Sequence, residues 1–229
     1  MSFFEPPRAR EPPRFERPPK PTWQGPPDNV VGGVVALDLL LARSEKAVVM
    51  IDSATAYPAG AEFAVEVRWR GELPDRIWSG LAPQPNRSWS GELPGELFRL
   101  GVQFADGSKA TTLDSGPAER LAAAYARVIE EPGGEGSLGD LGEEPEATDM
   151  VEGPVLLEQR AGGGGHRWSQ SLWLWPLPPK GPLTFVCEWP ALGITLSRAE
   201  IDTALLHEAA ARSRTVWDDL SAASPPPAS

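Results

Sequence analysis

The chain has 229 residues, enough for one medium domain or two small ones, and 41% of them are apolar. Its formal net charge of −11 argues against a nucleic-acid partner, which requires a basic surface, and against binding to an anionic membrane. The single cysteine, Cys187, excludes an intrachain disulfide and a cysteine-based zinc site. We therefore expect no cofactor and no metal. The N-terminus has no apolar signal segment, so we expect a cytoplasmic protein.

Residues 1–29 predict a disordered, proline-rich arm. Pro-Pro pairs recur at 6–7, 12–13 and 18–19, and proline opposes both helices and sheet ladders. Such an arm either docks into an aromatic groove of a partner or is a plain spacer. Its aromatic residues, among them Trp23, are more than a spacer usually carries, which makes Trp23 a candidate partner contact.

From residue 30 to 113 the apolar residues alternate, as in half-buried antiparallel strands. The segments "VVALDLLLARS" and "AVVMIDSATAY" predict two strands, and "YPAG" turns the chain into a third, "AEFAVEVRWRG". In that strand Phe63, Val65, Val67 and Trp69 share one face. The segment "ELFRLGVQFADGSKATTL" predicts a hairpin with a two-residue turn at Asp106-Gly107.

Residues 114–152 predict an insertion within one domain, partly helical over 117–131 and then acidic and glycine-rich. Nine acidic residues and no basic one lie between Glu130 and Glu152, so the acidity of the chain belongs mostly to this segment. A linker between two domains is the alternative. The piece after it, however, contains too few strands to close a sheet alone.

After the insertion, the run "AGGGGH" (161–166) predicts a flexible loop, and "HRWSQSLWLWPL" a strand that is apolar on both faces. A turn at residues 178–181 leads to "PLTFVCEWP", the last expected strand, whose aromatic side chains we expect beside those of the strand before it. The motif "SRAE" (197–200) has the spacing of a helix capping box and predicts a terminal helix to about Trp217. Residues 218–229 predict a disordered tail.

No catalytic motif is legible in the chain. Cys187 alternates with Phe185 and Trp189, which indicates an inert core residue. His166 is interpreted as a polar loop residue and His207 as a solvent-facing helix residue. Acidic residues such as Asp52 and Glu66 lie on separate strands at unknown separations.

The tryptophans of residues 171–190 indicate core rather than a sugar-stacking platform, because their neighbours are mainly Leu and Pro. A more polar cluster lies just upstream. If the chain has a small-ligand site or partner contact, we expect it at His166, Arg167, Trp168 and Gln170.

The C-terminal block, from Trp173 to Pro179 and from Gly181 to Pro190, resembles a group of actinobacterial proteins that carry a "WxWPLPPxGPLTFVCEWP" pattern. The likeness includes the glycines 162–165, Trp168 and "LGI" (192–194), and extends loosely to "VVALDLLLAR" and "GVQFADGSKAT". It covers about half of the chain. The resemblance implies no activity, so no site residue is carried over.

The sequence thus predicts a mainly β protein, an antiparallel β-sandwich of seven to nine strands that is immunoglobulin-like in broad architecture, with one C-terminal helix. Residues 30–217 would form this single domain, with 114–152 inserted; a small open barrel is the alternative. We expect a non-enzymatic module that binds an unidentified protein partner. The alternatives are a small-ligand or carbohydrate-binding domain and an unrecognised enzyme. The oligomeric state and the partner are not readable from the sequence.

Overall fold

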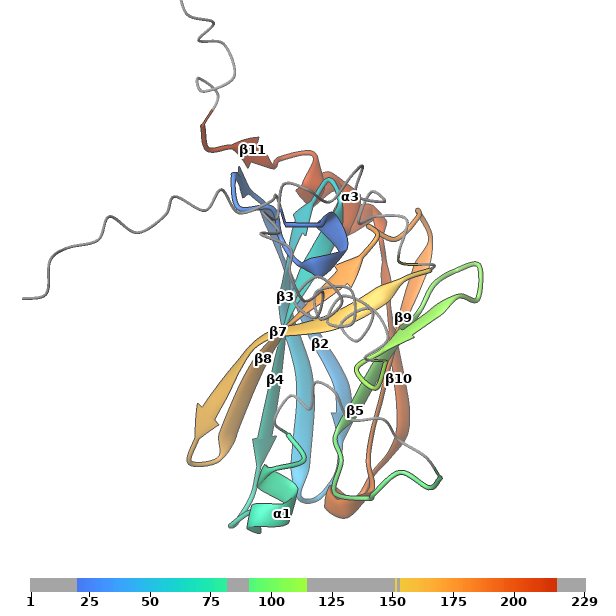
Figure 1. The fold of residues 1–229 in the computed structure, drawn as a ribbon. Coiled ribbons are helices and arrows are strands. Elements are labelled where there is room, and N and C mark those ends of the chain that lie inside the picture. The colour runs from blue at the N-terminus through green and yellow to red at the C-terminus, as the bar shows by residue number, and fades with distance from the viewer. Residues whose placement is uncertain (1–19, 82–90, 115–150, 152, 218–229) are drawn as a thin grey trace, which may run out of the picture.

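A computed structural model describes residues 20–81, 91–114, 151 and 153–217 (Figure 1). Within this part of the chain the protein is mainly β, with antiparallel sheets and two short helices. The expected mainly β, antiparallel class is therefore confirmed. The expected helix at 117–131, the acidic run apart from Val151, the arm up to residue 19 and the tail 218–229 lie outside the described residues.

The larger sheet has five strands, and each pairs antiparallel with its neighbours. Short turns connect consecutive strands, such as Pro58-Ala59, because residues 57 and 60 pair directly. In spatial order the strands are β2 (Gly33–Arg43), β3 (Ala47–Tyr57), β4 (Gly60–Trp69), β8 (Arg167–Trp175) and β7 (Val155–Gly164).

The second sheet has four strands, and a two-stranded ribbon lies at one end of the molecule (Figure 1). The four strands, in spatial order, are β10 (Ile194–Asp202), β9 (Pro182–Trp189), β5 (Arg99–Gln103) and β6 (Lys109–Thr111). The ribbon pairs β1 (Val30–Val31) with β11 (Arg214–Thr215). Two short segments, α1 (Asp75–Trp78) and the 3-10 helix η2 (Pro190–Leu192), lie in connections.

One hydrophobic core receives side chains from both sheets. The rings of Phe63 in β4 and Phe185 in β9 meet edge to face, with centroids 5.0 Å apart. The predicted alternation of β4 is confirmed, since Phe63, Val65, Val67 and Trp69 are all buried. Cys187 belongs to the same core, as expected. Burial of this continuous apolar set supplies the main driving force for folding.

A second, smaller cluster lies around Trp23 and contains Val151 and Val155. Trp23 belongs to the 3-10 helix η1 (Thr22–Gln24) and is almost fully buried. The expected disordered arm therefore does not extend to residue 29, because residues 22–24 fold against the five-stranded sheet. The apolar contact area of the indole ring offsets the entropy lost when this short segment is ordered.

The C-terminal region corrects the prediction of a long helix. Residues 194–202 form β10, and the helix α3 spans only Ala204–Ala210 before the chain reaches β11. Local capping-box spacing is a weak signal, and here sheet pairing overrides it. Ala199 pairs with Phe185 and Ile201 with Leu183, so every second residue of the segment faces the core side. Strand β9 is consequently not the last strand.

Two turn predictions and one prediction of strand pairing are also corrected. The glycines 162–164 are the end of strand β7, and only Gly165-His166 form the turn to β8, with Gly165 at φ +61°. The hairpin β5–β6 is confirmed, but its loop has three residues instead of two. The Phe104 N–H donates to the Ser108 carbonyl oxygen, which closes the loop around residues 105–107. Within that loop only Gly107 has a positive φ. Strands β8 and β9 belong to different sheets, so their aromatic side chains do not form a cross-strand set.

Candidate functional site

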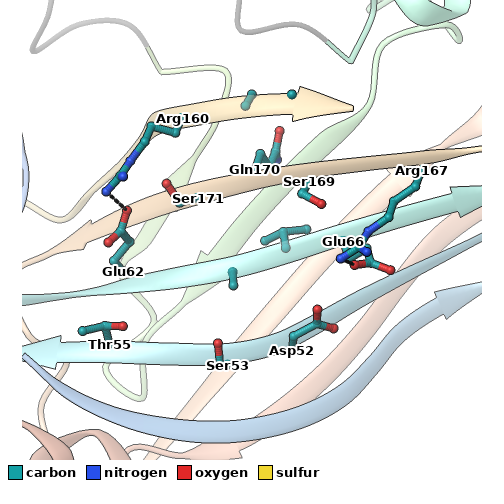
Figure 2. Close-up of a pocket in the computed structure, with 14 residues that line it drawn as sticks. Asp52, Ser53, Thr55, Glu62, Glu66, Arg160, Arg167, Ser169, Gln170 and Ser171 are labelled. Carbon is teal, nitrogen blue, oxygen red and sulfur yellow. Dashed lines mark ion pairs between the residues drawn. The ribbon is translucent and has the colours of Figure 1, made fainter. Parts of the chain in front are cut away.

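A polar trough with a volume of about 500 Å³ crosses the five-stranded sheet on the face opposite the core. It extends over β3, β4, β8 and β7 (Figure 2). Strand alternation explains its position: Phe63 and Val65 enter the core, so Glu62, Ala64 and Glu66 face the other way. We call this hollow the polar trough. Its lining comprises Asp52, Ser53, Thr55, Glu62, Ala64, Val65, Glu66, Arg160, Ala161, Gly162, Arg167, Ser169, Gln170 and Ser171.

Small side chains form the floor of the polar trough. Ala64 in β4 pairs with Ser171 in β8, and Gly162 in β7 pairs with Ser169. The Ser171 hydroxyl oxygen is buried and has no hydrogen-bond partner among the described residues. On the β3 side a register shift between Ile51 and Ser53 inserts Asp52 into the strand. The hollow exists because short residues lie between long charged ones.

Glu66 is the buried charge of the polar trough. Its side chain is only 2% exposed, whereas the side chains of Arg68 and Arg167 are 61% and 60% exposed. Arg68 Nε–H donates to Glu66 Oε1, and the Arg167 guanidinium forms an ion pair with Oε2 (Figure 2). A buried carboxylate requires such partners, because an isolated charge would lose its hydration without compensation. Both arginines are thereby held at the rim.

A second ion pair lies at the other end of the trough. Arg160 Nη2 is 3.8 Å from Glu62 Oε1, and the Arg160 side chain is 84% exposed while that of Glu62 is 15% exposed. Figure 2 shows Arg160 and Arg167 on the β7–β8 side and the acidic residues on the β3–β4 side. The guanidinium groups reach solvent and the Glu62 and Glu66 carboxylates lie beneath them. Arginine side chains therefore form the exposed layer over β7 and β8, above the carboxylates of β4.

The five residues singled out from the sequence are not brought together on one surface. Arg167 and Gln170 both belong to the lining of the polar trough, but the buried Gln170 side chain lies on the same face of β8 as Trp168. Trp168 is buried on the core side, where its ring meets Trp78 at 5.4 Å and its Nε1–H donates to Gln170 Oε1 at 3.5 Å. His166 is exposed in the β7–β8 turn, 6.4 Å from the Trp69 ring, and Trp23 is buried in its own cluster.

Sequence reasoning did not assemble Glu62, Glu66 and Arg160 into a site. Alternation places Glu62 and Glu66 on one face of β4, and this signal was visible. What the sequence does not contain is the pairing of β4 with β8 and of β8 with β7, which brings Arg167 and Arg160 to those acids. The pairing of β4 with β8 joins segments about one hundred residues apart in the chain, and β7 is joined to β8 through their hairpin.

Cys187 and His207 both lie outside the polar trough. Cys187 is buried, and desolvation raises the pKa of its thiol to about 12. His207 is half-buried rather than solvent-facing, because its Nε2 lies 2.8 Å from the Pro178 carbonyl oxygen in a hydrogen bond. Among the residues that the structure describes, no group of three or more His, Cys, Asp or Glu side chains is arranged to hold a metal.

A smaller hollow of about 270 Å³ lies on the outer face of the four-stranded sheet. It contains the ion pair between Arg99 Nη1 and Glu188 Oε2, at 2.6 Å, and the exposed side chain of Leu196. Arg99 also donates to the carbonyl oxygens of Leu93 and Pro94. These bonds hold both terminal nitrogens of the Arg99 guanidinium within the sheet and the connection before it.

Comparisons with protein-family models, with curated proteins and with solved structures give no match to this chain. In the described ranges no helix has the length and apolar character needed to cross a membrane. The site must therefore be interpreted from its own chemistry.

Proposed function

We propose that the chain is a non-enzymatic interaction module, built on a single antiparallel β-sandwich that is immunoglobulin-like in broad architecture, and that the polar trough is its contact surface. The shared core, with Phe63 against Phe185, supports the sandwich. Such sandwiches host many functions, so the proposal depends on the site and not on the fold. The likeness of residues 173–190 to actinobacterial proteins stays a prediction, as does a cytoplasmic location.

The observation that carries the proposal is the arrangement of exposed arginines over buried carboxylates. Glu66 pairs with Arg167, and Glu62 lies 3.8 Å from Arg160, while the two arginine side chains are 60% and 84% exposed. Exposed guanidinium groups are well suited to partner recognition, because each offers several N–H donors in a planar fork. The Ser171 hydroxyl, which has no hydrogen-bond partner in the described part of the chain, adds a polar group in the floor.

The test compares two tryptophan substitutions at strand positions in different sheets. Ala64→Trp fills the floor of the polar trough, whereas Thr195→Trp places an equal ring at an exposed position of β10, in the four-stranded sheet. Tagged full-length chains would be incubated with source-cell lysate and the retained proteins quantified. We expect a protein that the wild type and Thr195→Trp retain and Ala64→Trp does not. Identical retained sets for both variants would contradict the proposal.

A second candidate is a small-ligand site, which the size of the hollow favours. A volume of about 500 Å³ lies within the range of small-molecule sites, and hydroxyl groups with charges of both signs suit a polar ligand such as a sugar. Ring stacking would not contribute, because Trp168 and Trp173 are buried and no aromatic residue belongs to the described lining. Thermal denaturation with a panel of mono- and disaccharides tests it: a stabilisation lost in Ala64→Trp supports the site.

Support for an enzyme is weaker. That hypothesis requires His166, an acid and Arg167 in one cleft. The polar trough joins Arg167 to Glu66, but His166 is not part of its lining and its ring lies beside Trp69. Binding is therefore the function that the geometry supports best.

A further inference from the structure

Strand β7 is an edge of the five-stranded sheet. It pairs with β8 on one side, and none of its residues forms a backbone hydrogen bond on the other side within the described chain. Residues 160–165 are all exposed, and Figure 1 shows the end of the β7–β8 hairpin standing away from the second sheet. An edge strand presents alternate N–H and C=O groups that a further strand can pair with.

The glycines of this edge fall into two groups. A Cβ on Gly163 would lie 2.3 Å from the Arg167 carbonyl oxygen, and Gly165 has a positive φ, so the hairpin itself requires both. A Cβ on Gly162 or Gly164 would meet nothing within 4 Å. Glycine inside a strand costs about 0.5–1 kcal/mol, and the packing of the described residues gives no reason for it at these two positions. Glycine in a strand often marks the close approach of another backbone or a ligand.

Two arginines flank these open glycines on the outer face. Gly164 pairs with Arg167, and Arg160 lies four residues before Gly164 on the same strand. A strand added beside β7 would lie about 4.8 Å from it, with side chains about 13 Å apart at positions i and i+4. In the structure both guanidinium groups turn toward Glu62 and Glu66 of β4, away from the free edge (Figure 2). Arg160, which is 84% exposed and 3.8 Å from Glu62, would turn back to a carboxylate placed opposite it. Arg167 would turn from Glu66, which keeps Arg68 as its partner, and reach a second carboxylate across Gly164, a position without a side chain.

We propose that the free edge of β7 binds an extended acidic segment of a partner protein as an added strand, with carboxylates at i and i+4 for Arg160 and Arg167. This inference rests on the proposed interaction function and specifies its partner. A second copy of the chain fits less well, because antiparallel β7–β7 pairing would place Arg160 and Arg167 of both copies along one seam. Like charges in such a seam repel, whereas an acidic segment is attracted.

The probe is the acetylated, amidated peptide Thr-Glu-Val-Thr-Val-Glu-Thr, titrated into the ¹⁵N-labelled full chain. We expect the largest shift changes, and slowed amide exchange, at residues 160–164. Replacing both Glu by Lys should abolish binding. Two further peptides carry an N-methyl group on the central Thr or on the Val after it. Since only alternate amides of an added strand pair with β7, one of the two should bind about tenfold more weakly and the other as before.

Two chain variants complete the test. Gly164→Val, which has open space around its new side chain, should keep the melting temperature and lower peptide affinity about tenfold by blocking the path to Arg167. Arg160→Ala should lower affinity similarly without affecting folding, since that side chain is 84% exposed. Unchanged affinity in both variants would overturn the inference.

The outcomes separate this inference from the function on which it rests. Binding that shifts Thr55, Ser169 and Ser171 but is insensitive to either N-methyl group would leave the polar trough as a contact surface and overturn strand addition. If the chemical shifts of residues 160–164 change with the concentration of the chain in the absence of peptide, a second copy of the chain occupies the edge. Absence of any shift at millimolar peptide would also overturn the inference.

Discussion

The indole Nε1–H of Trp173 donates a hydrogen bond to the carbonyl oxygen of Thr22, at 3.1 Å. This bond joins β8 to a segment 151 residues earlier in the chain, and Trp23 is buried next to it. Gln159 Nε2–H adds a second bond, to the Gln24 carbonyl oxygen at 2.9 Å. Residues 22–24 are therefore part of the folded domain, and any truncation of the proline-rich arm should end before residue 20.

Removing the Trp23 side chain should destabilise the fold. Trp23→Ala empties the small cluster with Val151 and Val155, and we expect the free energy of unfolding to fall by about 3 kcal/mol. The matched control is Trp217→Ala, because that side chain is 67% exposed and should cost less than about 0.5 kcal/mol. Urea denaturation followed by circular dichroism measures both. Equal losses would mean that the Trp23 cluster does not contribute to folding.

Glu158 should make the stability of the chain depend on pH. It lies in β7 opposite Leu172, and desolvation raises the pKa of its carboxyl group from 4.5 to about 7. The folded state therefore binds this proton more tightly than the unfolded state does. Its contribution is present in full below pH 4.5 and is lost as the pH rises towards 7. Glu158→Gln should remove this slope and stabilise the chain at pH 8 by on the order of 2 kcal/mol.

The measurement is the free energy of unfolding between pH 4 and pH 8 for the wild type and Glu158→Gln. Glu200→Gln is a suitable control, since that residue is exposed in β10. Parallel curves for the wild type and Glu158→Gln would show that Glu158 is solvated and titrates normally.

Cys187 should be unreactive while the chain is folded. The thiolate is the reactive form, and a pKa of about 12 leaves a negligible fraction of it at pH 8. Burial between neighbouring strands also blocks reagents. We expect labelling by a thiol reagent only in denaturant, with the labelling curve following the unfolding curve. Rapid labelling of the native protein would place Cys187 at an accessible surface.

The elements that could be predicted from the sequence are those in which alternation and turn chemistry agree. Apolar residues alternate strictly from Phe63 to Trp69, and Asp106-Gly107 marks the turn between β5 and β6. The sequence therefore predicts both the strand and the hairpin. For residues 194–202 the prediction of a helix was wrong. The alternation of apolar residues in this segment is weak, and Ser197 and Glu200 have the spacing of a helix capping box. Pairing with β9, a tertiary effect, decides its structure.

The site was less predictable for a physical reason. The sequence singles out Arg167 as a polar residue beside the tryptophans, and the structure places it in the lining of the polar trough. The sequence does not show that Trp168 belongs to the core while Arg167 faces the trough. Neighbours in a strand point to opposite faces, and only the pairing with β4 shows which face is core. Trp23 looked available in a proline-rich arm, and only the Val151 and Val155 cluster shows that it is covered.

The two carboxylates of the polar trough should differ in their contribution to stability. Glu66 is buried and contacts two guanidinium groups, whereas Glu62 has one partner at 3.8 Å that is largely exposed. A fully buried ion pair that loses one partner costs about 3–5 kcal/mol, but Arg68 and Arg167 can return to water. We therefore expect Glu66→Gln to lower the free energy of unfolding by about 1–2 kcal/mol. Glu62→Gln should cost less than about 0.5 kcal/mol, as for an ordinary surface pair.

Salt distinguishes the two substitutions further. Screening acts strongly on exposed charges and weakly on buried ones, so the difference between wild type and Glu62→Gln should vanish in 1 M NaCl. The difference between wild type and Glu66→Gln should persist, because Glu66 is shielded from ions by the arginines above it. Chemical denaturation with urea, which adds no charge, measures both differences at low and high salt. A Glu66→Gln effect that disappears in salt would mean that Glu66 is open to solvent and that it does not fix the rim arginines.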